Sequence, residues 1–254
     1  MRIAYDVIGN KEKSVAILGA NTKAPKKAAR EIMKRHKAVK SVLRKLSDRE
    51  GEFRLYQTKL LLGKRDTEIV HKEHNYLIKV DPQKVYFSPR EGTERQRIAN
   101  KVKQGERILI MFSGAGPYAI AIGKKHPENE IVCVDINIDA IIYAEKNVRL
   151  NKLKNIKNIC GDVREIRNLG KFDRIIMPLV ETAIEFLDEA VLYSKKGTII
   201  HLYGLSKRKT AEDLEELVEE VADTYNFKYK IIGKQDVLPY APRVRKVRLD
   251  LKIL

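Results

Sequence analysis

The chain of 254 residues contains no tryptophan, only two cysteines and no long apolar run. Two cysteines cannot staple a disulfide-rich domain, and Cys133 and Cys160 both lie in apolar strand patterns, where a free cysteine acts as a small hydrophobe. No run approaches the roughly 20 apolar residues that cross a bilayer, and the N-terminus has no signal-peptide pattern. The five histidines are scattered, without the spacing of metal ligands. We therefore predict a cytoplasmic protein that spans no membrane and binds no metal.

Basic residues, in contrast, are plentiful. The chain has 51 Lys and Arg against 34 Asp and Glu, which gives a formal net charge of +17. The first hundred residues hold 24 basic and 12 acidic residues, so +12 of this charge lies in that segment. Dense mixed charge is common in thermophile proteins, but it does not explain such an imbalance. The excess favours contact with a polyanion, and nucleic acid is the expected partner.

A glycine loop between two apolar strands is the most informative segment. A strand at residues 107–112 precedes the loop Ser113-Gly-Ala-Gly116, and a helix then leads to a second strand at 130–134 that ends in Asp135. A carboxylate about 20 residues beyond such a loop holds the ribose hydroxyls of a nucleoside cofactor in βαβ units. No third glycine is present where a pyrophosphate would lie on the helix N-terminus. S-adenosylmethionine therefore fits this loop better than NAD.

The flanking segments predict two domains. Residues 1–82 read as a small basic α+β domain that positions the polyanion, with a helix capped by Thr22 and carrying Pro25 in its first turn. Residues 83–254 read as an α/β domain whose last two strands pair antiparallel at a sheet edge. A short strand at Val85–Phe87 is expected to lead from the first domain into the second.

Several short motifs then point to one family. They are Tyr5-Asp-Val-Ile-Gly9, Gly51-Glu-Phe-Arg54, Val85-Tyr-Phe-Ser-Pro-Arg90 with Glu94-Arg95, Met111-Phe-Ser-Gly-Ala-Gly-Pro117, Asp135-Ile-Asn137, the segment 147–153, Gly161-Asp-Val-Arg-Glu165, Ile176-Met177 and Tyr240-Ala-Pro-Arg243. In type and order they resemble the archaeal and eukaryotic type of tRNA (guanine-N1)-methyltransferase, which modifies position 37 next to the anticodon. The resemblance implies a Rossmann-like class I methyltransferase sheet, S-adenosylmethionine as cofactor, and the anticodon loop and stem of tRNA as partner, bound by a monomer.

The resemblance also implies a role for each matching residue. Glu94 would be the general base, and Arg54 would stabilise guanine O6. The residues implied in cofactor binding are Tyr86, Phe112, Ser113, Gly114, Gly116, Pro117, Asp135, Ile136, Asn137, Asp162, Val163, Met177 and Pro178. The residues implied in tRNA binding are Arg54, Arg90, Arg95, Pro178, Tyr240 and Arg243.

The chemistry of the reaction calls for these residue types. Guanine N1 carries a proton at neutral pH, so its methylation needs a base to remove that proton. Negative charge then accumulates on O6, where a fixed guanidinium stabilises it in the transition state. The target nucleotide must also be unstacked to be reached. A pair such as Glu94 and Arg54 therefore favours methyl transfer over a tRNA-binding protein without turnover.

Two departures from the family pattern leave alternatives open. The sequence begins at the domain that follows the family's separate N-terminal domain, which inspects the tRNA elbow. Pro178 also stands where the family often has Asn in an Asn-Leu-Pro motif that borders the target base. The wyosine-pathway enzymes use the same scaffold, so methylation of a carbon of the tricyclic precursor and aminocarboxypropyl transfer both remain possible; Glu94 favours methyl transfer but does not exclude a second methylation.

Overall fold

The computed structural model describes residues 4–50, 55–207 and 211–254, and the chain divides into two compact units. The first unit comprises Met1–Gly92, Gly114–Pro117 and Asn137–Lys152, and the second comprises Thr93–Ser113, Tyr118–Ile136 and Leu153–Leu254. Arg54, the residue expected to contact guanine O6, lies outside the described residues. Within the described ranges, no helix is long and apolar enough to cross a membrane.

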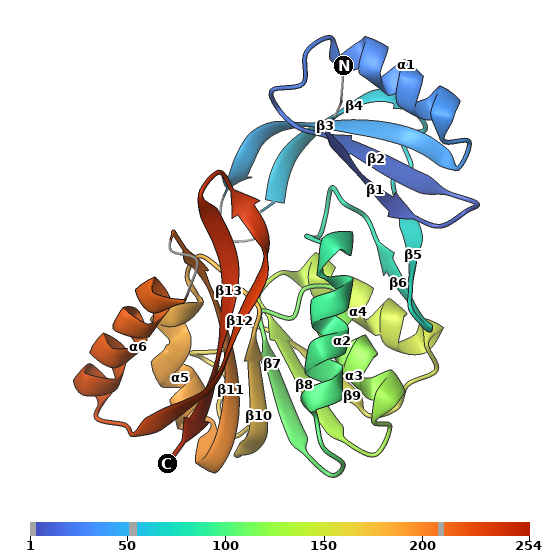
Figure 1. Ribbon diagram of the computed structural model, residues 1–254. Coiled ribbons are helices and arrows are strands. Elements are labelled where there is room, and N and C mark those ends of the chain that lie inside the picture. Colours follow the sequence, from blue (N-terminus) through green and yellow to red (C-terminus); the bar gives the residue numbers. More distant parts are fainter. Residues whose placement is uncertain (1–3, 51–54, 208–210) are drawn as a thin grey trace. The chain divides into compact units, whose positions relative to one another are not determined.

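The first unit contains a four-stranded sheet, a separate hairpin and two α-helices (Figure 1). Its elements are β1 (Tyr5–Gly9), β2 (Ser14–Leu18), α1 (Pro25–Arg35), β3 (Val39–Glu50), β4 (Leu55–Gly63), β5 (Ile69–Glu73), β6 (Tyr76–Val80), the 3-10 helix η1 (Pro89–Glu91) and α4 (Ile138–Leu150). The sheet has the order β1-β2-β3-β4, and β5 pairs only with β6 among the described strands. Strands β1 and β2 pair antiparallel and form a hairpin whose turn follows Gly9.

Two local expectations for this unit are wrong. Thr22 does not cap α1, because its hydroxyl donates to the carbonyl of Gly19 at 2.8 Å and the N-cap is Ala24, which has a left-handed backbone. Pro25 does occupy the first turn, as expected. Val85 to Phe87 is not a strand, since the Val85 amide bonds back to the Asp81 carbonyl in a turn. The alternating burial of Val85 and Phe87 therefore reflects a packed loop without a partner strand.

The second unit is built on a seven-stranded sheet with the order β12-β13-β11-β10-β7-β8-β9. Its elements are α2 (Gly92–Lys101), which begins at the last residue of the first unit, β7 (Arg107–Met111), α3 (Pro117–Lys125), β8 (Glu130–Asp135), β9 (Ile156–Cys160), β10 (Phe172–Met177), the 3-10 helix η2 (Ala183–Phe186), α5 (Leu187–Leu192), β11 (Ser194–Ser206), α6 (Glu212–Tyr225), β12 (Tyr229–Ala241) and β13 (Val244–Ile253). Strands β11, β10, β7, β8 and β9 run parallel, while β12 and β13 pair antiparallel as expected.

The order of these strands determines where a ligand binds. The chain proceeds from β7 outward to β9 and then returns to β10 on the other side of β7, so the direction of winding reverses between β7 and β10. In open α/β sheets, ligands bind outside the carboxyl ends of the strands at such a reversal. The central strands β10, β7 and β8 are mostly apolar and buried, as expected for parallel strands covered on both faces.

Candidate active site

Eight of the predicted cofactor residues lie in the second unit, at the carboxyl ends of four neighbouring parallel strands. They are Phe112 and Ser113 after β7, Asp135 and Ile136 at the end of β8, Asp162 and Val163 after β9, and Met177 and Pro178 at the end of β10. The strand ends are in register, because Met111 pairs with Val134 and Asp135 pairs with Cys160. The structure therefore brings residues from four separate motifs to one edge of the sheet.

The residues directly after β7 have an unusual backbone. Phe112 has φ of 58°, a left-handed conformation that is strained for a bulky residue and is concentrated at functional sites. Its ring packs edge-on against Phe186, with centroids 4.9 Å apart. The buried hydroxyl of Ser113 has no hydrogen-bond partner within the described part of the chain. A buried hydroxyl without a partner at this edge is consistent with a polar ligand group beside it.

The carboxylate of Asp162 already has a cationic partner. The Arg164 guanidinium donates from Nε to both carboxylate oxygens, at 3.1 and 3.0 Å, and holds the pKa of Asp162 below its ordinary value. Arg164 also lies over the Phe186 ring, 4.9 Å from its centroid. The sequence analysis missed Arg164 and Phe186; the Gly161-Asp-Val-Arg-Glu165 motif signalled the arginine, whereas Phe186 carries no motif.

Five predicted cofactor residues belong to the first unit: Tyr86, Gly114, Gly116, Pro117 and Asn137. Gly114 and Gly116 both have left-handed backbones, with φ of 56° and 77°, which explains the two glycines of the loop. A Cβ on Gly114 would lie 3.9 Å from the Tyr86 carbonyl oxygen, and Pro117 begins α3. The Asn137 side chain caps α4, accepting from the Asp139 amide at 2.9 Å. Its side chain therefore has a structural role at the start of α4.

Glu94, the predicted general base, is buried in the first turn of α2 with a 2% exposed side chain. Its Oε1 accepts a hydrogen bond from the Tyr203 hydroxyl at 2.8 Å and a second from Nη1 of Arg248. Its Oε2 forms a long ion pair with Arg97, with 3.4 Å between Nη1 and Oε2. Burial raises the pKa of Tyr203 well above its ordinary value, so this hydroxyl stays a donor at neutral pH. One carboxylate oxygen is thus held firmly and the other loosely.

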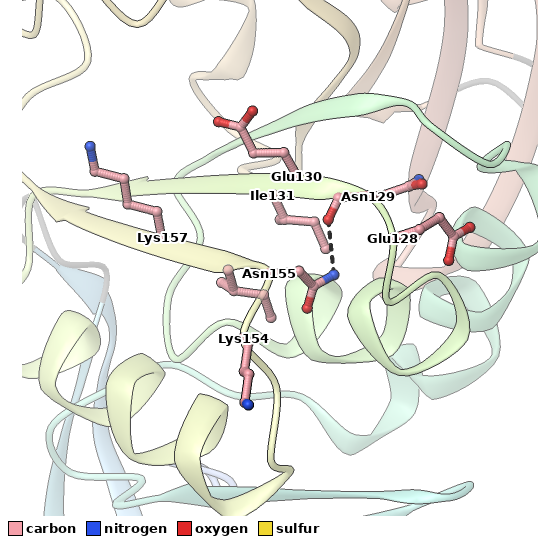
Figure 2. A pocket seen from close by; sticks show the side chains of 8 residues that line it. Glu128, Asn129, Glu130, Ile131, Lys154, Asn155 and Lys157 are labelled. Carbon is pink, nitrogen blue, oxygen red and sulfur yellow. Dashed lines mark hydrogen bonds between the residues drawn. The ribbon is translucent and has the colours of Figure 1, made fainter.

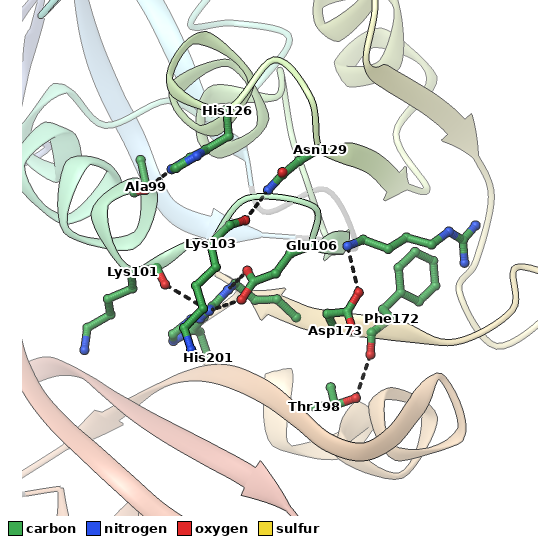
Figure 3. Close-up of polar contacts among 12 residues, drawn as sticks. Ala99, Lys101, Lys103, Glu106, His126, Asn129, Phe172, Asp173, Thr198 and His201 are labelled. Atoms are coloured by element: carbon green, nitrogen blue, oxygen red, sulfur yellow. Dashed lines mark hydrogen bonds and ion pairs between the residues drawn. The ribbon is translucent and has the colours of Figure 1, made fainter.

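The contacts of Glu94 continue as a chain of buried ionisable groups across β13, β11 and β10. Arg248 donates from Nε to Asp250 at 2.6 Å, and Asp250 lies 2.6 Å from Nδ1 of His201. His201 Nε2 is 2.6 Å from Arg174, whose guanidinium donates to both oxygens of Glu106 at 2.7 and 2.8 Å; Figure 3 shows His201 and Glu106 at this end. Each cation thereby has an anionic partner, as buried charges require.

Burial determines the protonation states of the ionisable groups in this network. It lowers the pKa of His201 to about 4, so the imidazole is neutral at pH 7 and can donate to Asp250 while it accepts from Arg174. Burial by itself would raise the pKa of Asp250, but the hydrogen bond from His201 and the charge of Arg248 lower it well below its ordinary value. Sequence reasoning missed this network, because its members are up to 154 positions apart.

The predicted tRNA contacts are placed very differently from one another. Arg90 is exposed and pairs with Asp6, with its Nη2 2.6 Å from Oδ1. Arg95 is 2% exposed and among the largest fully buried side chains, so the structure offers no exposed guanidinium for the tRNA contact expected of it. Tyr240 donates its hydroxyl to Glu181. Arg243 is exposed in the turn between β12 and β13, with φ of 61°.

A shallow pocket of about 320 Å³ lies at the opposite ends of the strands. It is lined by the start of β8 and β9 and the loops before them, including Glu130, Lys154 and Lys157 (Figure 2). Asn155 fixes these loops by donating to the Asn129 carbonyl at 3.0 Å. Because ligands of open α/β sheets bind at the carboxyl ends, this pocket is a poor candidate for the cofactor.

Known proteins match this sequence and fold along nearly the whole chain. The family described as "TRM5/TYW2 methyltransferase domain" matches residues 69–232. The tRNA (guanine(37)-N(1))-methyltransferase Trm5b of Pyrococcus abyssi is 38% identical over 98% of this chain and 74% of its own length. The tRNA (guanine(37)-N(1))/4-demethylwyosine(37)-methyltransferase Taw22 of Nanoarchaeum equitans is 30% identical over 95% of this chain and 98% of its own.

Two solved structures are also similar. The complex of aTrm5 and tRNALeu superposes with a TM-score of 0.87 at 35% identity, covering 100% of this chain and 73% of that chain. TYW2 of M. jannaschii in complex with AdoMet superposes with a TM-score of 0.75 at 26% identity, covering 98% of this chain and 99% of that chain. The Rossmann-like fold predicted from the sequence is therefore confirmed, and this chain belongs to the TRM5/TYW2 family of methyltransferases.

Proposed function

We propose that this protein transfers the methyl group of S-adenosylmethionine to N1 of guanosine at position 37 of tRNA. The observation that carries the proposal is that Ser113, Asp135 and Asp162 lie at the carboxyl ends of neighbouring strands of one sheet, in a chain that belongs to this family. The name of the Trm5b relative supports the reaction, and the tRNALeu complex of aTrm5 supports tRNA as the partner.

S-adenosylmethionine supplies an electrophilic methyl group on a sulfonium centre. The AdoMet complex of a relative supports this cofactor. In this chain the donor set fits a nucleoside, because Asp135 offers a carboxylate for ribose hydroxyls and the Ser113 hydroxyl, unpartnered among the described residues, lies directly after β7. Asp162, paired with Arg164, is proposed to contact the adenine amino group, and it must share its oxygens with that guanidinium.

Glu94 is proposed as the base that removes the N1 proton. Tyr203 and Arg248 hold Oε1, so the proton would be taken by Oε2, whose contact to Arg97 is long at 3.4 Å. A fixed carboxylate with one loosely held oxygen is suited to this step, because general-base catalysis depends on positioning within hydrogen-bond reach. Arg54 is proposed to stabilise the negative charge that develops on O6.

A second candidate is methylation of a carbon of the tricyclic wyosine precursor at the same position. Pro178 favours this alternative, since it replaces the asparagine that often borders the target base in the family. The Taw22 relative, whose name includes both guanine and 4-demethylwyosine, supports a site that accepts either base. Aminocarboxypropyl transfer is disfavoured by Glu94, because that reaction requires no removal of an N1 proton.

The direct test uses an unmodified tRNA transcript and two preparations of cofactor, one labelled in the methyl group and one in the carboxyl group. Methyl label in N1-methylguanosine at position 37 is expected, and a transcript with adenosine at position 37 should accept none. Transfer of carboxyl label would establish the aminocarboxypropyl reaction instead. No transfer to guanosine 37 would overturn the proposal.

The cofactor assignment has its own test. Asp135→Ala should weaken S-adenosylmethionine binding by about tenfold or more, because it removes a carboxylate hydrogen-bonded to the ribose. Its methyl-transfer rate at saturating cofactor should change much less. Glu130→Ala, at the opposite end of the same strand β8, is the matched control and should leave cofactor binding unchanged.

A further inference from the structure

We propose that Asn147 is the positioning residue that fixes the glycine loop, and that it does so by tying the loop to the hairpin β5–β6. This inference rests on the proposed function, since it takes the loop to hold S-adenosylmethionine. All the residues involved belong to the first unit: the loop segment Gly114–Pro117, the hairpin, and helix α4. The motif segment 147–153 begins at this asparagine, and its pattern predicted no role for the side chain.

Asn147 is fully buried and its amide group makes three hydrogen bonds. Its Nδ2 donates to the carbonyl of Ala115 at 2.9 Å and to the carbonyl of Lys79 at 3.0 Å. Its Oδ1 accepts from the Lys79 amide at 2.6 Å. One side chain thus joins the centre of the glycine loop to the backbone of β6.

The loop needs such a partner because of its own conformation. Gly114 and Gly116 have left-handed backbones on either side of Ala115, which is itself fully buried. A buried carbonyl outside helix and sheet costs free energy unless a side chain or water satisfies it. The same face of α4 touches the loop again one turn earlier, where a Cβ on Gly116 would lie 3.5 Å from the Ala144 Cβ. Helix α4 therefore supports the loop at two consecutive residues.

Asn151, the C-cap residue of the same helix, provides a nearly identical group without the loop contact. Asn151 donates to the Leu77 carbonyl at 2.7 Å and accepts from the Leu77 amide at 2.9 Å, as Asn147 does with Lys79. Its second donated bond goes to the carbonyl of Asn147 in its own helix, at 2.8 Å. The two asparagines thus bind alternate residues of β6 in the same way, and only Asn147 reaches Ala115.

This pairing gives a matched experiment on the full chain. Asn147→Asp and Asn151→Asp each replace two donated hydrogen bonds by a carboxylate that faces two carbonyl oxygens, while each keeps the accepted bond from β6. We therefore expect similar losses of thermal stability. The dissociation constant for S-adenosylmethionine, measured by calorimetry below both melting temperatures, should rise about tenfold or more in Asn147→Asp and less than about twofold in Asn151→Asp.

The outcomes separate this inference from the proposed function. If the wild-type protein binds S-adenosylmethionine and the two variants weaken that binding equally, the role of Asn147 is overturned and the proposed function is not. Wild-type protein that does not bind this cofactor would overturn the proposed function and, with it, this inference. If Asn147→Asp does not fold, Asn147→Ser and Asn151→Ser provide the same comparison without an added charge, and the same difference in affinity is expected.

Discussion

Helices α1 and α2 are both rich in charged residues, but they place those charges in opposite environments. In α1 only the apolar side chains are buried, and its basic residues, Lys26, Lys27, Arg30, Lys34 and Arg35, are exposed. In α2 the side chains of Glu94 and Arg95 are both only 2% exposed. The comparison shows that a charged residue in a sequence can have either of two partners. It can contact a polyanion at the protein surface, or it can pair with an opposite charge in the protein interior.

The largest expected effect concerns Arg95. Because its side chain is fully buried, Arg95→Gln should lower the free energy of unfolding by about 2 kcal/mol or more, since the substitution removes a large buried side chain and leaves buried polar groups without their partner. Denaturant unfolding measures this loss. Arg97→Gln, which removes a half-exposed guanidinium on the same helix, should cost about 0.5 kcal/mol or less. Equal, small losses in the two variants would contradict the buried position of Arg95.

The second expected effect is a dependence of stability on pH that comes from His201. Its pKa is about 4 in the folded protein and 6.5 ordinarily, so the unfolded chain binds more protons between these values. The stability that His201 contributes is therefore complete above pH 6.5 and is lost as the pH falls toward 4, by up to about 3 kcal/mol. Urea unfolding between pH 7 and pH 4.5 measures this decline.

The variant His201→Asn distinguishes this source of pH dependence from others. It should be less stable than wild type at pH 7, and its unfolding free energy should fall less steeply with decreasing pH. A parallel decline in the two proteins would assign the pH dependence to other groups, with Asp250 as the next candidate because its pKa is also lowered.

The smallest expected effect concerns the basic face of α1. Replacing Lys26, Lys27 and Arg30 together by glutamine should weaken tRNA binding by about tenfold and reduce the dependence of affinity on salt by about two charges. Filter binding at several salt concentrations measures both. A control in which three exposed lysines of the second unit, Lys124, Lys154 and Lys157, are replaced by glutamine should retain the wild-type salt slope. Equal slopes in all three proteins would remove α1 from the tRNA-binding surface.

The sequence predicted most of the fold because its signals were local. The strand, glycine loop, helix and strand from Arg107 to Asp135 are confirmed, since apolar runs and paired glycines determine them within a few residues. The loop at Val85–Phe87 was assigned wrongly, because alternation of buried residues shows packing but not whether a neighbouring strand is present. Thr22 was assigned wrongly because another acceptor, the Gly19 carbonyl, takes its hydroxyl.

The site was predicted less completely because its supports are distant in sequence. The motifs identified the residues at the strand ends as site residues. They gave no indication that Arg248 donates a hydrogen bond to Glu94 or that Asn147 donates one to the Ala115 carbonyl. Arg95 was expected to contact tRNA because it directly follows the predicted base in the family motif. Its burial follows from tertiary packing that no local pattern encodes.

The central claim is that Glu94, although buried and paired, removes the N1 proton. Single-turnover methyl transfer to a tRNA transcript with guanosine at position 37 tests this claim in two variants, Glu94→Gln and Glu106→Gln. The second variant is the control, because it loses the carboxylate at the other end of the same network of buried ionisable groups. The rate should fall by about 10²-fold or more in Glu94→Gln and stay within about threefold of wild type in folded Glu106→Gln. Full activity of Glu94→Gln, or equal losses in the two variants, would contradict the assignment of Glu94 as the base.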